Sequence, residues 1–458
     1  MRTTLALTEE TWSKLIAELD EPRETGGFLL AGFARSGTEL TLLGRTLHWL
    51  ADEQCLIRTN KQLVIGSAGF VPSLAAAAKD KSVPVFLHTH PGGAAAPSRR
   101  DGKVDRDLRE PALCRSGQPF YASLIMAGTR LKPHFTGMIY GPDGEIASLE
   151  RIRILGRRIR IVGAADHATT TVNFDAFDRQ IRAFGKDGQG LIARLRVGVV
   201  GAGGTGSAVF EQLVRLGIGE IVVIDDDVLS ETNLTRIHES AKSQCGVPKV
   251  DVAKEAAARI GLDTSVRTIA GRISDKASAR ALKHCDVVFG CTDDETGRQQ
   301  LSKLALWYLI PVFDMGFLVS TTQKGAITGL YGRVTTVVPG AACLVCRDYA
   351  TPEGLHAESL PAEERKARAQ EGYVPGLRER DPSVGAYTTM VAAFAINELL
   401  DRLIGYSVQP GAGSTETLIR LHERKLGFNS KLPRGHHWCG NRSNWGRGDT
   451  PSFLGYTQ

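Results

Sequence analysis

Apolar residues in the first third of the chain gather in short runs bounded by glycine, proline and charged residues. Runs of this length are typical of buried strands. We predict four such strands, at residues 26–32, 83–90, 121–128 and 134–140. The turn sequence GPDGE at 141–145 closes the block. The pattern therefore predicts a mixed α/β domain over residues 1–150.

The apolar spacing changes to a helical period in a second block, which opens with FDAFDRQIRAFGKDGQGLIARL at 174–195. Residues 196–227 follow and read as a strand, a glycine-rich turn, a helix and a second strand. Such a unit predicts a parallel sheet with helices on both faces. Further strands are predicted at residues 265–271, 285–291 and 311–317. Between the blocks, residues 151–171 are rich first in arginine and then in small polar residues, so we predict a linker there and a second domain over 172–458.

The chain has 458 residues, a formal net charge of +6 and 42% hydrophobic residues, as expected for a globular protein of two or three domains. Arginines cluster at 151–160 without interleaved aromatic residues, so we expect a solvated strand and not a nucleic-acid surface, while an acidic protein partner stays open. The eight cysteines are scattered, and MRTTLALTEETW lacks the regions of a signal peptide. No apolar run reaches the ~18 residues of a membrane span. We therefore expect a reduced, cytoplasmic protein without membrane or nucleic-acid partners.

Two histidines one residue apart, followed by a serine and an aspartate, make up the motif HTHPGGAAAPSRRD. His88 and His90 can face one ion at the end of a strand, and neutral imidazole is a favoured zinc ligand. Asp101 adds a third ligand and leaves a fourth position open, as in a catalytic zinc site that holds a water. Glu24 in ETGGFLLAG is the candidate base, and Ser98 is the candidate donor to the developing oxyanion.

This constellation resembles the JAMM (MPN+) metallopeptidases, whose pattern is a distant Glu, then HxH, seven residues, Ser, two residues and Asp. The resemblance covers residues 1–150. It implies a cytidine-deaminase-like mixed sheet and an isopeptidase or processing peptidase that acts near the C-terminus of a ubiquitin-like protein. The alternative is a degenerate domain kept as a scaffold, although every catalytic position of the pattern is present.

The glycine-rich sequence GAGGTGS lies between a predicted strand and a predicted helix, where backbone N–H groups can bind phosphates. Such a turn alone indicates a nucleotide, with NAD as the usual ligand. The next strand ends at Asp225, where an acid that binds ribose belongs. Polar and cationic side chains then favour adenylation, because negative charge accumulates at the α-phosphate in the transition state. They are Asn233, Arg236 and Lys249. CTDDETGRQQ adds Asp293, a candidate magnesium ligand, and Arg298.

These motifs resemble the ThiF/MoeB-type ubiquitin-activating superfamily, with its linked patterns GxGGxGS, D-x-D…S/T-N-L-x-R, G-x-P-K and C-T-D-N-x-x-x-R. Asp294 replaces the usual Asn of the last pattern. The resemblance spans residues 174–440 and implies a Rossmann-like domain that binds ATP and Mg²⁺. The residues implied to bind this cofactor are Gly201, Gly203, Gly204, Gly206, Asp225, Asp227, Asn233, Arg236, Lys249, Asp293 and Arg298. Asp293 is the implied Mg²⁺ ligand.

The sequence FDRQIRAFGKDGQ also resembles the family helix from which one arginine reaches the ATP of a neighbouring subunit. Arg179 matches that arginine, which implies a homodimer through this domain. Arg179, Arg236 and Lys249 are the candidate catalytic residues of the domain. Without the linked motifs around them, each of these three residues would be interpreted as an ordinary surface charge.

Cysteines in CxxC spacing occur at Cys343 and Cys346, and HHWCGNR supplies His436 and Cys439. A CxxC pair in a reduced protein is typical of zinc or redox sites, and a distant second pair favours structural zinc. ThiF/MoeB-type enzymes carry such a site from two CxxC pairs. The resemblance therefore implies zinc ligands at Cys343, Cys346, Cys439 and His436, or His437 in its place. The alternative is free buried thiols.

No cysteine lies between Cys346 and Cys439, although many members of the family have a thioester-forming cysteine in the crossover segment, here EGYVPGLRERDPSVGAYTTMVAAFAINELL. We therefore expect an acyl-adenylate to be the last product on this protein and to pass to an amine, a sulfur carrier or the cysteine of a separate conjugating enzyme. The alternative is that Cys439 or one of the CxxC pair is the nucleophile, with His436 and His437 lowering the pKa of the Cys439 thiol.

The two domains on one chain resemble the JAMM/activating-enzyme fusions of bacterial ubiquitin-like conjugation operons. One substrate then serves both, a ubiquitin-like protein with a C-terminal glycine, which the first domain trims or deconjugates and the second adenylates. One alternative is an adenylyltransferase and peptidase pair for a sulfur carrier or small peptide in cofactor or natural-product biosynthesis. Another is a catalytically inactive adaptor for ubiquitin-like tails. The residues do not distinguish between protein conjugation, antiviral defence and sulfur transfer as the pathway.

Overall fold

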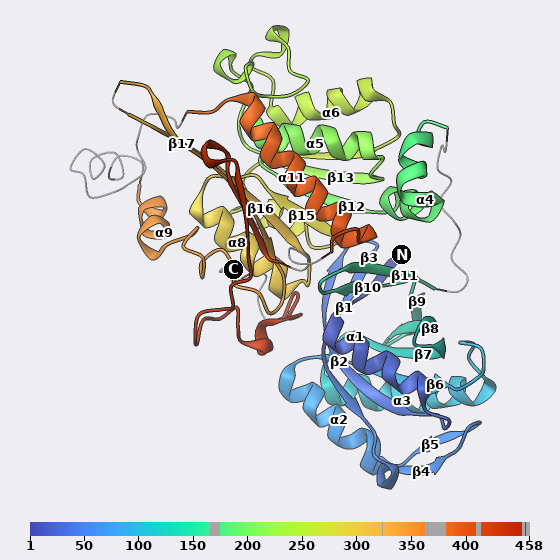
Figure 1. Ribbon diagram of the computed structural model, residues 1–458. Coiled ribbons are helices and arrows are strands. Elements are labelled where there is room, and N and C mark those ends of the chain that lie inside the picture. The colour runs from blue at the N-terminus through green and yellow to red at the C-terminus, as the bar shows by residue number, and fades with distance from the viewer. Residues whose placement is uncertain are drawn as a thin grey trace. The chain divides into compact units, whose positions relative to one another are not determined.

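The computed structural model describes residues 1–164, 175–322, 324–361, 364, 382–408, 414–450 and 454 (Figure 1). The chain forms two compact units. The first contains the described residues of Met1–Ala168, Trp307–Leu309 and Arg442–Gln458. The second contains those of Thr169–Leu306 and Ile310–Asn441. Each unit is therefore assembled from separate parts of the chain.

A nine-stranded sheet of mixed parallel and antiparallel pairs forms the centre of the first unit. In spatial order its strands are β11 (Ile159–Gly163), β10 (Arg151–Leu155), β1 (Arg2–Thr8), β3 (Glu39–Trp49), β2 (Gly26–Ser36), β6 (Val83–His90), β7 (Tyr121–Thr129), β8 (Lys132–Gly141) and β9 (Gly144–Ser148). A separate hairpin pairs β4 (Cys55–Arg58) with β5 (Leu63–Ile65). The four predicted strands are present as β2, β6, β7 and β8, and β6 has the predicted bounds.

Both faces of this sheet carry a buried apolar cluster, since successive residues of a strand point to opposite faces. The helices of the unit are α1 (Glu9–Ala17), α2 (Ser67–Asp80) and α3 (Arg99–Ser116). Leu29 of β2 belongs to a cluster that contains Trp12 of α1. Its neighbour Phe28 belongs to a second cluster with Leu74 of α2 and Leu108 of α3. The mixed α/β domain predicted from the sequence is therefore confirmed.

Residues 151–163 form two strands and not the linker that we predicted. β10 pairs in parallel with β1, and Ile152 and Ile154 are buried in the apolar cluster. Arg153 points to the opposite face and is also fully buried, where its guanidinium donates to Leu309 O at 3.2 Å. The surrounding arginines conceal the alternation of apolar residues, which only the pairing with β1 makes evident. Most of the remaining predicted linker lies outside the described residues.

The C-terminal segment, residues 442–450, belongs to the first unit and not to the predicted second domain. β6 pairs with only the first part of β2, and beyond it Gly448 forms a parallel bridge with Phe33. Asp449 N donates to Phe33 O at 2.8 Å, and Arg35 N donates to Asp449 Oδ2 at 2.9 Å. The segment therefore satisfies backbone groups of β2 that β6 leaves without a strand partner.

Replacing Gly448 with alanine is expected to lower the free energy of unfolding of the first unit by about 3 kcal/mol. Gly448 has φ +62°, and a Cβ there would overlap with Phe33 O. Gly37 has φ +52°, but a Cβ there meets nothing within 4 Å. Gly37→Ala is therefore the matched control, with a strain cost of about 1 kcal/mol. Chemical unfolding measures the free energy of unfolding of both variants. Equal decreases in the two variants would contradict the packing of Gly448 on β2.

An eight-stranded sheet forms the second unit, and its first five strands in spatial order are parallel while the last three are antiparallel. The order is β14 (Ser265–Ala270), β13 (Glu220–Asp225), β12 (Arg196–Val200), β15 (Val287–Gly290), β16 (Val312–Thr321), β17 (Ile327–Val337), β18 (Glu416–Arg420) and β19 (Lys425–Asn429). The helices are α4 (Asp178–Ala193), α5 (Gly204–Leu216), α6 (Lys249–Ile260), α7 (Lys276–Ala281), α8 (Glu295–Trp307), α9 (Pro352–Ser359) and α11 (Gly385–Ile404). The predicted parallel sheet is confirmed, and an antiparallel extension is added to it.

The direction of chain progression reverses at β12, which lies between β13 and β15. The connections that follow β12 and β15 therefore leave the sheet side by side, and Cys291 N donates to Val200 O at 2.8 Å. In open parallel sheets, such a reversal point at the carboxyl ends of the strands is where ligands bind. None of the described helices has the length and apolar character needed to cross a membrane.

Candidate active and metal sites

Three predicted zinc ligands of the first unit lie together at the end of β6. His88 and His90 point to the same side of the strand because they are two residues apart. Their Nε2 atoms are 3.0 Å apart, and Asp101 Oδ1 and Oδ2 lie 3.3 Å and 3.6 Å from His88 Nε2 and His90 Nε2 respectively. Tetrahedral zinc with bonds of about 2.0 Å places its ligand atoms about 3.3 Å apart. The donor set and its spacing therefore fit a zinc ion.

Asp101 is held in place by Ser98 at the start of α3. Ser98 N donates to Asp101 Oδ2 at 2.6 Å, and Asp101 N donates to Ser98 Oγ at 3.3 Å. Burial raises the pKa of the Asp101 carboxyl, but hydrogen bonds with His88 and Ser98 outweigh burial and hold that pKa well below its usual range. Asp101 is thus ionised, as a metal ligand must be. The observed function of Ser98 is to cap α3, and its donation to an oxyanion stays a prediction.

Glu24 lies directly before β2, and the pairing of β2 with β6 places it near the histidines. Thr25 N donates to Thr89 Oγ1 at 3.0 Å, and Thr89 N donates to Thr25 O at 2.9 Å. Arg58 Nε donates to Glu24 O at 3.1 Å. Burial raises the pKa of the Glu24 carboxyl, and the nearby His90 and His88 lower it in part. A partly buried carboxylate beside the ligand cluster is suited to accept and return a proton.

The glycine-rich loop joins β12 to α5, and its glycines are needed for different reasons. Gly201 has φ +92°, which disfavours other residues. A Cβ on Gly206 would overlap with Gly201 O, so this position closes the turn. A Cβ on Gly204 would lie 3.2 Å from Arg236 Cδ, which places that arginine beside the loop. A Cβ on Gly203, which precedes α5, would meet nothing within 4 Å, so the space on this side of the loop is open.

Asp225 connects the glycine-rich loop to Lys249. Its carboxylate accepts from Ala202 N at 2.6 Å and from Asp227 N at 2.9 Å. Lys249 Nζ lies 2.6 Å from Asp227 Oδ2 and 3.8 Å from Asp225 Oδ1. Burial raises the pKa of the Asp225 carboxyl, while Ala202 N and Lys249 oppose it. The structure thus brings Asp225, Asp227 and Lys249 together at the reversal point of the sheet.

The remaining predicted phosphate ligands, Asn233 and Arg236, lie in the segment between β13 and α6. Asn233 is buried and its Oδ1 accepts from Ser230 N at 3.2 Å, so only its amide N–H groups remain for a phosphate. Arg236 Nη1 donates to Thr232 O at 2.9 Å. Arg179 is exposed at the start of α4, and a single chain leaves its predicted contact with a neighbouring subunit as a prediction.

The loop after β15 carries Asp293 and leads into α8. Asp293 is exposed, whereas the Asp294 carboxylate accepts from Thr292 Oγ1 and Gly297 N and so caps the helix. Asparagine caps helices in the same way, which explains how this position accommodates either residue. Arg298 Nη2 donates to Thr292 O at 3.2 Å, so the first turn of α8 is hydrogen-bonded to the loop that precedes it. Its predicted contact with the nucleotide stays a prediction.

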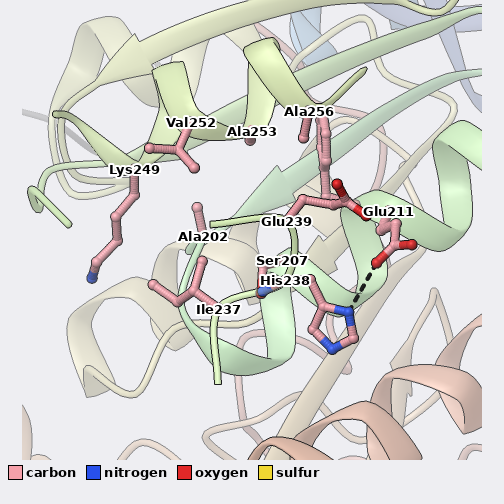
Figure 2. A pocket seen from close by; sticks show the side chains of 11 residues that line it. Ala202, Ser207, Glu211, Ile237, His238, Glu239, Lys249, Val252, Ala253 and Ala256 are labelled. Atoms are coloured by element: carbon pink, nitrogen blue, oxygen red, sulfur yellow. Dashed lines mark hydrogen bonds and ion pairs between the residues drawn. The ribbon is translucent and has the colours of Figure 1, made fainter. Parts of the chain in front are cut away.

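Figure 2 shows a pocket beside the glycine-rich loop, lined by residues of α5 and α6 and of the intervening 237–239 segment. Lys249, a predicted phosphate ligand, contributes to it, whereas Ala202 and His238 were not predicted. His238 Nδ1 lies 2.8 Å from Glu211 Oε2, and its Nε2 lies 2.8 Å from Thr389 Oγ1 of α11. No spacing in the sequence indicated this contact, because the partners come from separate helices.

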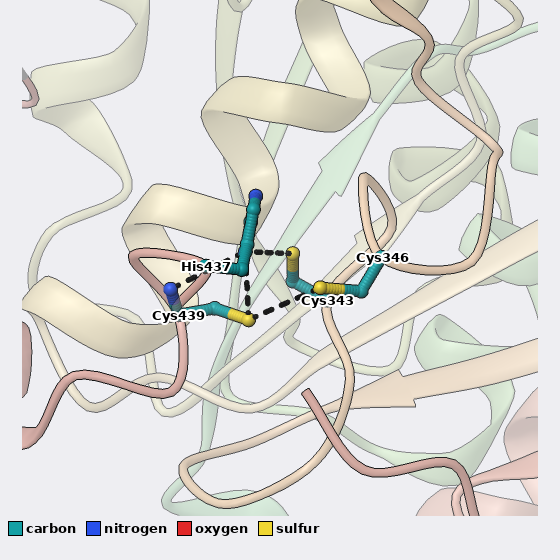
Figure 3. A group of neighbouring side chains, drawn as sticks. All are labelled: Cys343, Cys346, His437 and Cys439. Carbon is teal, nitrogen blue, oxygen red and sulfur yellow. Dashed lines mark hydrogen bonds between the residues drawn. The ribbon is translucent and has the colours of Figure 1, made fainter. Parts of the chain in front are cut away.

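A second ligand cluster lies in the second unit, where Cys343, Cys346 and Cys439 meet His437 (Figure 3). His437 Nδ1 lies 3.0 Å from Cys439 Sγ and 3.7 Å from Cys343 Sγ, and the Sγ atoms of Cys346 and Cys439 are 3.5 Å apart. Tetrahedral zinc with bonds of about 2.3 Å to sulfur separates such atoms by about 3.8 Å. The cluster therefore fits a zinc ion held by three thiolates and one imidazole.

His437, and not His436, is the histidine of this cluster, which corrects our first choice. A turn closed by His437 N donating to Arg434 O at 2.8 Å directs His437 inward, whereas His436 is exposed. The hydrogen bond from Cys343 lowers the pKa of Cys439 to about 5, and burial raises the pKa of Cys346. A preformed thiolate at Cys439 suits a metal ligand.

We expect His437→Ala to reduce the bound zinc of this cluster by about one equivalent and to lower the melting temperature of the second unit, because one of four ligands is lost. His436→Ala is the matched control, since it removes the neighbouring imidazole without changing the cluster. Metal analysis of the two purified variants measures the zinc content of each. Loss of zinc in His436→Ala with retention in His437→Ala would contradict the assignment of His437 as the ligand.

Buried polar side chains that sequence reasoning missed support the CxxC loop. Glu416 is buried on β18 and accepts from Arg347 Nη1 at 2.9 Å, from Tyr349 OH at 3.0 Å and from Thr335 Oγ1 at 3.0 Å. Arg347 and Tyr349 directly follow the CxxC sequence. Burial of such a network is tolerated because its partners satisfy one another. Glu416 is far in sequence from its three partners, so no local sequence pattern predicts these hydrogen bonds.

The family model for the ThiF family matches residues 177–437, and the model for prokaryotic homologs of the JAB domain matches residues 10–136. The SAMP-activating enzyme E1 of Haloferax volcanii is 32% identical over 169 residues, which are 37% of this chain and 59% of that protein. The molybdopterin-synthase adenylyltransferase of Salmonella typhimurium is 34% identical over 161 residues, 35% of this chain and 61% of that protein. This chain thus spans about three fifths of these relatives.

Among solved structures, E. coli MccB with ATP is similar at 20% identity and a TM-score of 0.46, over 59% of this chain and 75% of that chain. A similarity of this extent is too small to transfer a site or a substrate.

Proposed function

This chain belongs to the ThiF family and carries a JAB domain before its ThiF domain, and on that premise we propose that it acts twice on one ubiquitin-like protein. The second unit adenylates the C-terminal glycine with ATP and Mg²⁺. The first unit is a zinc peptidase that exposes this glycine in a precursor or releases it from a conjugate. Two relatives named for activating SAMP and for adenylyl transfer to molybdopterin synthase support a small protein as the substrate.

The observation that carries the adenylation proposal is the network that joins the glycine-rich loop, Asp225 and Lys249 at the reversal point of the sheet. In the reaction a carboxylate oxygen of the terminal glycine forms a bond to the α-phosphorus, and pyrophosphate leaves. Lys249 and Arg236 offset the negative charge that develops there. Asp293 would hold Mg²⁺, which neutralises the leaving phosphates. Asp225 would orient the ribose.

The peptidase proposal is supported by the ligand spacing of His88, His90 and Asp101 and by the adjacent Glu24. A zinc ion in this cluster would supply a water whose pKa is lowered to about 7. Glu24 accepts the proton of the attacking water and returns it to the leaving amine. The Ser98 hydroxyl, at the exposed start of α3, donates to the oxyanion.

The acyl-adenylate is the last product on this chain. Cys343, Cys346 and Cys439 belong to the zinc cluster, and no further cysteine lies between Cys346 and Cys439 in the sequence. The adenylate passes to an amine, to a sulfur carrier or to the cysteine of a separate conjugating enzyme. If Cys439 were the nucleophile instead, its lowered pKa would favour attack, and zinc would be held by fewer ligands.

A sulfur carrier is the second candidate substrate, and the similarity to a molybdopterin-synthase adenylyltransferase favours it. In this alternative the ThiF domain adenylates the carrier and the JAB domain matures it. A homodimer through the ThiF domain is part of the proposal, because exposed Arg179 on α4 is then available to the ATP of the partner subunit.

Mass spectrometry of the full chain with ATP, Mg²⁺ and a Gly-Gly-ended ubiquitin-like protein tests the proposal. We expect the mass of the partner adenylate and no thiol-labile adduct on the chain. ATP–pyrophosphate exchange should also depend on the partner and disappear when its terminal glycine is blocked. Exchange that does not need the partner would contradict a protein substrate, and a thiol-labile adduct would contradict adenylate as the last product.

A further inference from the structure

The first turn of α8 has its backbone N–H groups covered by carboxylates from two directions. Glu358 of α9 accepts from Glu295 N through Oε1 at 2.8 Å and from Thr296 N through Oε2 at 2.8 Å. The next N–H, that of Gly297, donates to the Asp294 carboxylate. Groups at a helix start have no partner within the helix, so these carboxylates also offset the positive end of its dipole.

The contact between the two helices is reciprocal. Glu295, the first residue of α8, accepts from both Thr351 N and Thr351 Oγ1, the latter at 2.9 Å, at the start of α9. A Cβ on Gly354 would overlap with the Glu295 carboxylate, so the small residue at this position makes the approach possible. Each helix therefore contributes one carboxylate to the N-terminus of the other, which fixes their mutual position.

Asp293 lies two residues before Glu295, in the loop that leads into this arrangement. Its side chain is exposed and has no hydrogen-bond or ion-pair partner among the described residues. Arg298 and Asp294 hold the loop from within α8 and its cap. Glu358 holds it from a helix that is more than fifty residues distant in sequence. The Asp293 side chain thus extends from a loop whose junction with α8 is anchored by Glu358.

We propose that Glu358 is a positioning residue for the Mg²⁺–ATP site and acts on Asp293 through Glu295 N and Thr296 N. The inference rests on the proposed adenylation, in which Asp293 holds Mg²⁺. Glutamine in place of Glu358 keeps the length of the side chain but replaces one accepting oxygen with an NH₂ group. That group faces a backbone N–H, so one charge-assisted bond is lost and a donor is set against a donor.

The test measures two properties of the full chain as a function of Mg²⁺: the binding of ATP by titration calorimetry without the partner, and partner-dependent ATP–pyrophosphate exchange at saturating ATP. Glu358→Gln is expected to raise the half-saturating Mg²⁺ concentration about ten-fold, since one hydrogen bond to a charged group is lost, and to keep kcat at saturating Mg²⁺ within about two-fold. Glu353→Gln on the same helix is the matched control, because Glu353 is exposed, and should match the wild type.

The possible outcomes separate the inference from the proposed function. Wild-type chain without any partner-dependent exchange would refute the adenylation itself. Wild-type exchange with an unchanged Mg²⁺ dependence in Glu358→Gln would overturn the inference alone. So would a loss of kcat that excess Mg²⁺ does not restore, because that loss would reflect general damage to the unit. If the glutamine variant does not fold, Glu358→Asp replaces it, with an expected shift of about two-fold in the same direction.

Discussion

Replacing Glu24 with glutamine should lower the rate of cleavage of a tail-extended ubiquitin-like protein about a thousand-fold, the range expected for loss of a general base. Glutamine has the same shape as glutamate but cannot accept the proton of the attacking water. Glu24 is not part of the His88, His90 and Asp101 cluster, so the zinc content of the first unit should stay unchanged. The measurement is the cleavage rate at saturating substrate together with metal analysis of the same preparation.

Glu21→Gln provides the control for this experiment, because Glu21 is exposed three residues before Glu24 and should keep the full rate. A chelator should stop cleavage by the wild type, and added zinc should restore it. Cleavage that persists in Glu24→Gln, or that resists the chelator, would refute the proposed zinc mechanism. Loss of zinc from Glu24→Gln would instead mean that the carboxylate has a structural function in the cluster.

Removing the Asp293 carboxylate should reduce ATP–pyrophosphate exchange about a hundred-fold or more, because a bound metal ion supplies several kcal/mol of charge stabilisation in such reactions. Asp293→Ala leaves the loop backbone in place, since the capping contacts come from Asp294 and Glu358. The second unit should therefore keep its melting temperature. Exchange is measured with the partner protein at saturating ATP and Mg²⁺.

Asp294→Asn is the matched control for Asp293→Ala. The Asp294 carboxylate caps α8 through Gly297 N, and an asparagine oxygen can accept the same bond. This variant should keep exchange within a few-fold of the wild type, consistent with the asparagine that the resembling family usually has there. If Asp294→Asn abolishes exchange and Asp293→Ala does not, the two aspartates have been assigned to the wrong functions.

Local pattern was sufficient to predict the elements on which the sites are built. The apolar run that ends at His88 and His90 forms β6 with the predicted bounds, and the strand, turn and helix around Gly201 form β12 and α5. In each case a buried apolar run is followed by a proline or a glycine, Pro91 after β6 and Gly201 after β12, so the sequence contains both the strand and its end. The ligand spacing of the HxH motif follows directly from that strand.

Elements whose apolar period is hidden, or whose partner is distant, were not predictable in this way. Arginines conceal the alternating Ile152 and Ile154 of β10, which became a linker in the prediction. The segment around Gly448 has few apolar residues, and its place beside Phe33 depends on a strand more than four hundred residues away. Such pairings are decided by which backbone edges remain unsatisfied after the rest of the sheet has formed.

The sequence by itself determined the chemistry that this protein can hold: a base, two imidazoles and a carboxylate in one register, a glycine-rich turn with its acids and cations, and three cysteines with adjacent histidines. Only the tertiary structure decided between His436 and His437, revealed the burial of Arg153, and joined Glu358 to the loop of Asp293. Residue type and spacing indicate whether a segment forms a helix or a strand. Which segments then pack together depends on the free energy of contacts between elements that are distant in sequence.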